Sequence, residues 1–210
     1  MRSRRLSVIA AIVAVVAFSG CTANAYPEIP RFAKSGGQTQ AELDRTLAKI
    51  PGLVFTEAEG SEPNVKGNTG YGYDIALDPG YMIADVPALI DFLVASAWSV
   101  RDGYMPNTTI EIKLNAGPLP SDKIDVVEAA EVAGWVPVNS QSHRIGDDGG
   151  SSPEFDNGSS RVGVWIDSET VSARRAATRG SIVNRKRLGE WPGPAAVVPD
   201  GMVVPREITQ

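Results

Sequence analysis

The sequence predicts an α+β fold in which a mainly antiparallel sheet is covered by helices on one face. Three segments, 71–77, 110–114 and 162–166, alternate apolar and polar residues in the manner of half-buried strands. Apolar residues recur at helical spacing after Thr39 and after Asp85. The strands lack the continuous apolar runs that are typical of doubly wound parallel sheets. We therefore expect a two-layer sandwich of the split βαβ, ferredoxin-like kind.

The first predicted element is a short helix that begins with a capping box. Thr39 and Glu42 have the spacing at which the hydroxyl accepts from the third backbone N–H while the carboxylate reaches back to the first. The apolar stripe of this helix comprises Leu43, Leu47 and Ile50. Gly52 then ends the helix, and a strand is expected over 53–55.

The longest predicted helix begins at Asp85, a plausible N-cap. Its apolar face comprises Val86, Leu89, Ile90, Leu93, Ala97 and Val100. A third helix is expected from Ser121 or Asp122 to Ala133, followed by a short strand that starts at Trp135. These helices must cover one face of the sheet.

The chain also contains a weak internal similarity. Segments 50–54 and 132–136 both place a glycine between a helix and an apolar stretch, and 72–75 matches 163–166 in the strand that follows. A duplication of two αββ units is one interpretation. The other is that turns between helices and strands often use glycine.

The amino terminus has the pattern of a signal peptide. Three arginines within residues 1–5 precede an apolar run of 13 residues from Leu6 to Phe18. The run is shorter than the roughly 20 residues that a helix needs to cross a bilayer. We therefore expect residues 1–20 to be removed on export.

The segment Phe18-Ser19-Gly20-Cys21 resembles the lipobox of bacterial lipoproteins. That resemblance implies cleavage before Cys21, a lipid on its sulfur and a chain held on the outside of the cell membrane. With arginine favoured over lysine, the chain resembles actinobacterial envelope lipoproteins of unknown function. A second interpretation is cleavage after Ala25 in the A-x-A sequence 23–25, which would release a soluble protein.

After removal of residues 1–20, three regions are expected. Residues 21–38 form a lipidated tether, 39–167 a globular α+β domain, and 168–210 a basic and then proline-rich irregular tail. The basic clusters of the tail are interpreted as a solvated face. From Cys21 onward, 17 basic residues face 25 acidic ones, which argues against a nucleic-acid partner and predicts repulsion from anionic lipid.

Catalytic and metal-binding residues are sparse in this sequence. His143 is its one histidine, and because no G-x-S-x-G elbow exposes a serine, we interpret it as a surface residue. The loop 146–160 is rich in carboxylates that suit calcium, but its spacing does not match an EF-hand, so an acidic surface loop is expected. No catalytic, cofactor or metal site is predicted.

One aromatic residue is a candidate for binding. By strand alternation Trp165 falls on the polar side of its strand, where it could contact an envelope protein or glycan unless the tail covers it. The sequence thus favours a lipid-anchored, non-enzymatic binding or scaffolding module of the envelope. The alternative is a cell-wall hydrolase that works with carboxylates such as Asp74 and Glu111.

Overall fold

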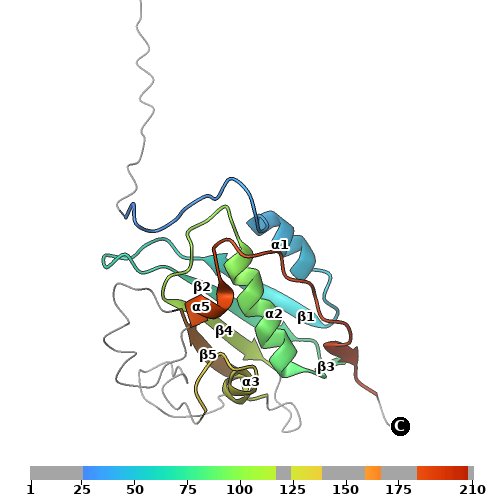
Figure 1. The fold of residues 1–210 in the computed structure, drawn as a ribbon. Helices are drawn as coiled ribbons and strands as arrows, with labels where there is room; N and C mark the ends of the chain where they lie inside the picture. The colour runs from blue at the N-terminus through green and yellow to red at the C-terminus, as the bar shows by residue number, and fades with distance from the viewer. Residues whose placement is uncertain (1–25, 117–123, 139–158, 167–183, 208–210) are drawn as a thin grey trace, which may run out of the picture.

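The structure, a computed structural model, describes residues 26–116, 124–138, 159–166 and 184–207. In chain order its elements are α1 (Gln40–Leu47), β1 (Leu53–Gly60), β2 (Gly70–Leu77), β3 (Tyr81–Ile83), α2 (Val86–Ser99), β4 (Thr109–Asn115), α3 (Val126–Val132), β5 (Ser159–Trp165), α5 (Asn184–Leu188) and β6 (Val203–Pro205) (Figure 1). The predicted α+β class with a mainly antiparallel sheet is confirmed.

The main sheet has the strand order β1-β2-β4-β5. The outer pairs β1–β2 and β4–β5 are antiparallel, whereas the central strands β2 and β4 are parallel and are joined through α2. The ferredoxin-like prediction is not confirmed, because in a split βαβ unit another strand lies between the two parallel strands. Alternation of apolar and polar residues shows that a strand has one buried face, but it contains no signal for strand direction or order.

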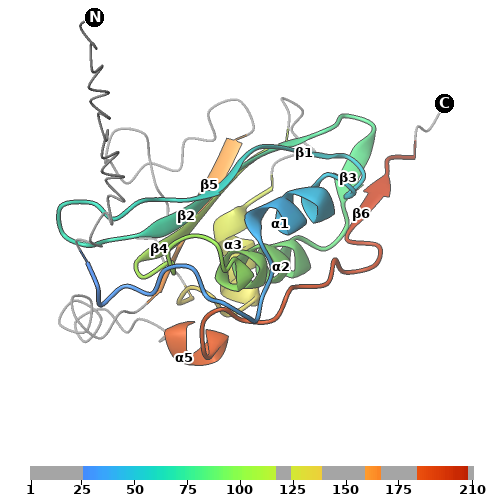
Figure 2. The ribbon, with the colours of Figure 1, turned by 90° about the horizontal axis from the view of Figure 1, so that it is seen from above.

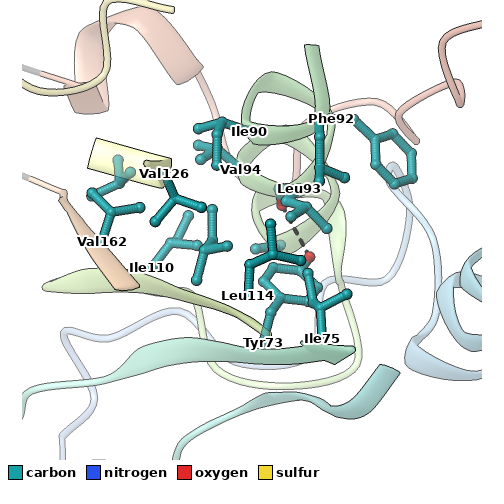
Figure 3. Packing of buried hydrophobic residues seen from close by; sticks show 14 of the residues in the cluster. Tyr73, Ile75, Ile90, Phe92, Leu93, Val94, Ile110, Leu114, Val126 and Val162 are labelled. Carbon is teal, nitrogen blue, oxygen red and sulfur yellow. Dashed lines mark hydrogen bonds between the residues drawn. The ribbon is translucent and has the colours of Figure 1, made fainter. Parts of the chain in front are cut away.

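Helices α1, α2 and α3 lie on the same side of the sheet (Figure 2). The core between α2 and the sheet includes Ile90, Leu93 and Val94 of α2, Tyr73 and Ile75 of β2, and Ile110 and Leu114 of β4 (Figure 3). Full burial of one such aliphatic side chain contributes about 1.5–3 kcal/mol. A helix cap contributes about 1 kcal/mol, so core packing is the larger source of stability.

The predicted start of α1 is confirmed in detail. Thr39 Oγ1 accepts a hydrogen bond from the Glu42 backbone N–H at 3.2 Å, and Glu42 Oε2 accepts from the Thr39 N–H at 2.7 Å. This bond from the Thr39 backbone holds the pKa of Glu42 below its usual value. Gly52 follows the helix at φ +74°, and a Cβ there would collide with the Tyr81 ring, so only glycine fits.

The predicted start of the third helix is wrong. Asp125, rather than Ser121 or Asp122, is the N-cap of α3: its carboxylate accepts from the backbone N–H of Val127 at 2.9 Å and of Glu128 at 3.1 Å. All three candidates are residues whose side chains can cap. The tertiary fold selects the one that lets α3 bury its apolar side, which no local pattern specifies.

The predicted strand at Trp135 is also absent. Gly134 ends α3 at φ +75°, and Trp135 and Val136 that follow are buried but belong to no strand. In the described residues the second αββ unit therefore lacks its first strand, which leaves the duplication without support. The shared glycine is explained by its place at a helix end.

Segments at both ends of the described chain pack on the domain. Ile29 is buried, and the Ala33 N–H donates to the Arg101 carbonyl at 2.8 Å. In the tail, β6 pairs with β3 in an antiparallel manner and Met202 is buried. Within the described residues, parts of the predicted tether and of the predicted irregular tail thus belong to the packed domain.

Candidate functional site

The sheet presents its polar residues on the face turned away from α1, α2 and α3. We call this surface the outer sheet face and define it by Asp74, Glu111, Lys113, Arg161 and Trp165. In the strand register Asp74 of β2 stands opposite Lys113 of β4, which stands opposite Arg161 of β5. Side chains from three strands therefore form one continuous polar row.

Ion pairs cross the outer sheet face between neighbouring strands. Lys113 Nζ lies 2.8 Å from Asp74 Oδ2, and Asn115 Nδ2 donates to Asp74 Oδ1 at 2.9 Å. Arg161 Nε lies 3.2 Å from Glu111 Oε1. Partly exposed pairs contribute only about 0–1 kcal/mol each, so they mainly orient the side chains. Each carboxylate considered for hydrolysis is thus engaged with a cation of the adjacent strand.

Trp165 lies at the end of β5 on the outer sheet face, and its side chain is 48% exposed. Its neighbours on this face are small: Thr109 stands directly opposite, Gly70 stands opposite Thr109, and Gly163 lies two residues earlier. The Trp165 carbonyl accepts a hydrogen bond from buried Asn184 Nδ2 at 2.9 Å. The arrangement presents an accessible indole on an anchored backbone.

The glycine-rich start of β2 serves strand packing. A Cβ at Gly70 would lie 2.9 Å from the Thr109 carbonyl oxygen, and one at Gly72 would lie 2.9 Å from Glu57 Oε1. Both distances are shorter than real Cβ atoms tolerate; at Gly70 the obstacle is a backbone atom, so glycine is required there, whereas at Gly72 the flexible Glu57 side chain could move aside. These residues make room for a neighbouring strand and a neighbouring carboxylate, and they form no phosphate-binding loop.

A groove of about 340 Å³ lies between α1 and the edge strand β1. Its lining comprises Asp44, Leu47, Ala48, Leu53, Val54, Phe55, Thr56, Glu57 and Ala58. The carboxylates of Asp44 and Glu57 accompany a mostly apolar lining, and none of its described residues is a histidine, cysteine, lysine or arginine. The groove therefore offers fewer polar and charged groups for catalysis or ligand binding than the outer sheet face.

Several residues singled out in the sequence lie outside the described part of the chain. These are Cys21, Ala25, His143 and residues 146–158 of the predicted acidic loop. Within the described ranges, no group of three or more His, Cys, Asp or Glu side chains is placed to hold a metal ion. A search of the same ranges finds no helix with the length and apolarity needed to cross a bilayer.

The tail contains two cation–aromatic contacts that sequence reasoning missed. Arg185 lies 4.8 Å from the ring centre of Trp98, and Arg187 lies 3.7 Å from that of Trp135. Arg187 also pairs with Asp91 at 3.0 Å. The sequence predicts a solvated face for this basic cluster, but two of its side chains attach α5 to the domain. The sequence carries no signal that pairs distant arginines with tryptophans.

The outer sheet face combines an exposed indole, which can stack against a ligand, with charged groups that can form hydrogen bonds. No family model matches the chain, and neither a curated protein nor a solved structure is significantly similar to it.

Proposed function

We propose that the chain is a lipid-anchored extracytoplasmic lipoprotein that acts as a non-enzymatic binding or scaffolding module of the cell envelope. Its anchor would be a lipid on Cys21, the single cysteine of the chain, at the end of a signal-like segment. The observation that carries the binding role is the exposed indole of Trp165 on the same sheet face as the charged row. The proposal includes a two-layer sandwich whose helices cover one sheet face and leave the other for a ligand.

A glycan of the envelope is the favoured ligand. The outer sheet face offers a single aromatic ring surrounded by polar and small residues, whereas the centre of a protein interface is usually more apolar. A sugar ring can stack on an indole and form hydrogen bonds with neighbouring charged groups. The hydrolase alternative has less support, because Asp74 and Glu111 are each ion-paired across the sheet.

Replacing Cys21 with serine is expected to abolish lipid attachment. Wild-type protein produced in a lipoprotein-processing bacterium should incorporate radiolabelled palmitate and sediment with the membranes, because a thioether-linked lipid requires the Cys21 sulfur. Cys21→Ser should incorporate no label and leave the membrane fraction. Wild-type protein recovered from the medium with Tyr26 as its first residue would instead support cleavage after Ala25 and contradict the anchor.

Replacing Trp165 with alanine is expected to weaken binding to purified cell-wall glycan by about tenfold or more, since an aromatic anchor commonly contributes on the order of 2 kcal/mol. Co-sedimentation with the insoluble glycan measures the change. The matched control is Val132→Ala, which truncates an exposed apolar residue of α3 on the other side of the molecule.

Equal glycan binding by wild type and Trp165→Ala would contradict the glycan proposal. A protein that co-purifies with the wild type and with Val132→Ala, but is lost from Trp165→Ala, would identify a protein partner at the same face instead.

A further inference from the structure

Two exposed apolar side chains lie at the end of the domain where the described chain begins. Val65, in the loop between β1 and β2, is 93% exposed, and Phe32, in the segment before α1, is 53% exposed. Figures 1 and 2 both place that loop beside the start of the described chain, at the end of the molecule opposite β3 and β6. We call this end, with Phe32, Val65 and Lys66, the tether-end surface.

The loop is packed against the first described residue. A Cβ at Gly67 would lie 2.9 Å from Tyr26 Cδ1 and 3.6 Å from Ile29 Cδ1, so the backbone of the loop contacts both side chains closely. Asn107 Nδ2 also donates to the Gly67 carbonyl at 2.9 Å. The position of the loop is thereby fixed relative to the point where the tether joins the domain.

Asn64 holds the tip of this loop in one conformation. Its Oδ1 accepts hydrogen bonds from the backbone N–H groups of Lys66 at 2.9 Å and Asn68 at 3.1 Å, and its carbonyl accepts from the Gly67 N–H at 2.8 Å. The turn leaves Val65 and Lys66 on its exposed side. The tip thus holds the Val65 side chain exposed to solvent in a fixed position, from which it can contact an apolar surface.

Phe32 is held outward by a comparable local arrangement. Its φ of 54° lies in the left-handed region, which an aromatic residue rarely adopts. Its N–H donates to the Gly103 carbonyl at 3.2 Å, and the Arg31 guanidinium lies 4.4 Å from the Phe32 ring and 4.5 Å from the Tyr104 ring. Aromatic rings beside an arginine are typical of membrane–water interfaces.

The charges near this end differ from those of the whole chain. In the described segments 26–34 and 61–69, Arg31, Lys34 and Lys66 are basic and Glu28 and Glu62 are acidic, and Arg31 lies 3.5 Å from the Glu62 carboxylate. These two segments therefore carry little net charge, whereas the whole chain has a formal charge of −5. Repulsion between this end and anionic lipid is therefore small.

A short segment joins this end to the proposed lipid. Five peptide steps separate Cys21 from Tyr26, and they span at most about 18 Å in any conformation. A lipid on Cys21 would thus keep Tyr26, and the loop packed on it, near the headgroups. Such an anchor gives the domain a high effective concentration at the bilayer, so that even weak contacts with lipid form.

We propose that the tether-end surface rests on the lipid bilayer, with Val65 and Phe32 inserted at the interface and Lys66 among anionic headgroups. This inference rests on the proposed lipid anchor. It fixes an orientation in which β3 and β6 point away from the membrane. The predicted repulsion of the acidic chain then acts on the rest of the domain and favours this single orientation.

Thiol labelling of the lipidated protein tests the contact. Val65→Cys and, as the matched control at the opposite end, Met82→Cys of β3 each introduce one exposed thiol, while lipidated Cys21 is a thioether and does not react. Each variant is labelled with an environment-sensitive fluorophore and reconstituted in vesicles that contain phosphatidylglycerol. Nitroxide-bearing lipids should quench the label at position 65 several-fold more strongly than the label at position 82.

Phe32→Cys provides a second site that does not depend on the loop, and its label should be quenched like that at position 65. Equal, weak quenching at positions 32, 65 and 82 in protein that carries palmitate would overturn the membrane contact and leave the anchor intact. Protein without palmitate would overturn both proposals, so the two failures are distinguishable.

Discussion

Replacing Trp98 with alanine is expected to lower the free energy of unfolding by about 3–5 kcal/mol, as for other fully buried tryptophans. Trp98 is 1% exposed, and a Cβ at Gly193 would lie 2.9 Å from its ring. Its Nε1 donates to the Glu190 carbonyl at 3.3 Å, and Arg185 stacks on it at 4.8 Å. Truncation therefore leaves a cavity in the core and also detaches the tail. Urea unfolding followed by circular dichroism measures the loss.

Trp165→Ala is the matched control, because it removes the same side chain from a half-exposed position. It should cost no more than about 1 kcal/mol, in the range of surface substitutions. Equal losses for the two variants would contradict the assignment of Trp98 to the core and of Trp165 to the accessible sheet face.

Raising the pH above about 10 is expected to destabilise the protein steeply through two buried tyrosines. Burial raises the pKa of Tyr71 and of Tyr73 above this ordinary value, so the folded state keeps both protons while the unfolded chain loses them. Stability from these groups is complete below pH 10 and is lost as the pH rises towards the folded pKa values. The slope should approach about 1.4 kcal/mol per pH unit for each tyrosine.

Tyr73→Phe tests this slope. The variant keeps the ring but removes the hydroxyl that donates to the Leu93 carbonyl at 2.9 Å, at a cost of about 1 kcal/mol near neutral pH. Above pH 10 the contribution of Tyr73 to the slope should disappear, leaving that of Tyr71. Denaturant unfolding across the alkaline range measures it. A slope as steep as that of the wild type would show that Tyr73 is not the buried group that titrates.

Features with local causes could be predicted from the sequence. The capping box at Thr39 and the N-cap at Asp85 depend on side chains within one turn, and both form. The alternating segments also form strands, because a period of two places every second residue in the core. The same alternation placed Trp165 on the polar face.

Features that depend on distant contacts could not be predicted. The parallel pairing of β2 with β4 arises from how α2 crosses the sheet, and the three-residue strands β3 and β6 are too short to show a period. The accessibility of Trp165 depends on Thr109 and Gly70, which become its neighbours on the sheet only in the final register. Likewise, the loop that carries Val65 meets the start of the described chain only once Gly67 packs on Tyr26.

The contact between Met202 and the start of α2 has a consequence for folding during synthesis. The Met202 carbonyl accepts hydrogen bonds from the N–H groups of Ala84 at 2.9 Å and Asp85 at 3.4 Å, beside the pairing of β3 with β6. A ribosome makes α2 long before it makes Met202. The two residues that precede the longest helix therefore lack these hydrogen bonds in the nascent chain, and the domain acquires its full stability only after β6 has emerged.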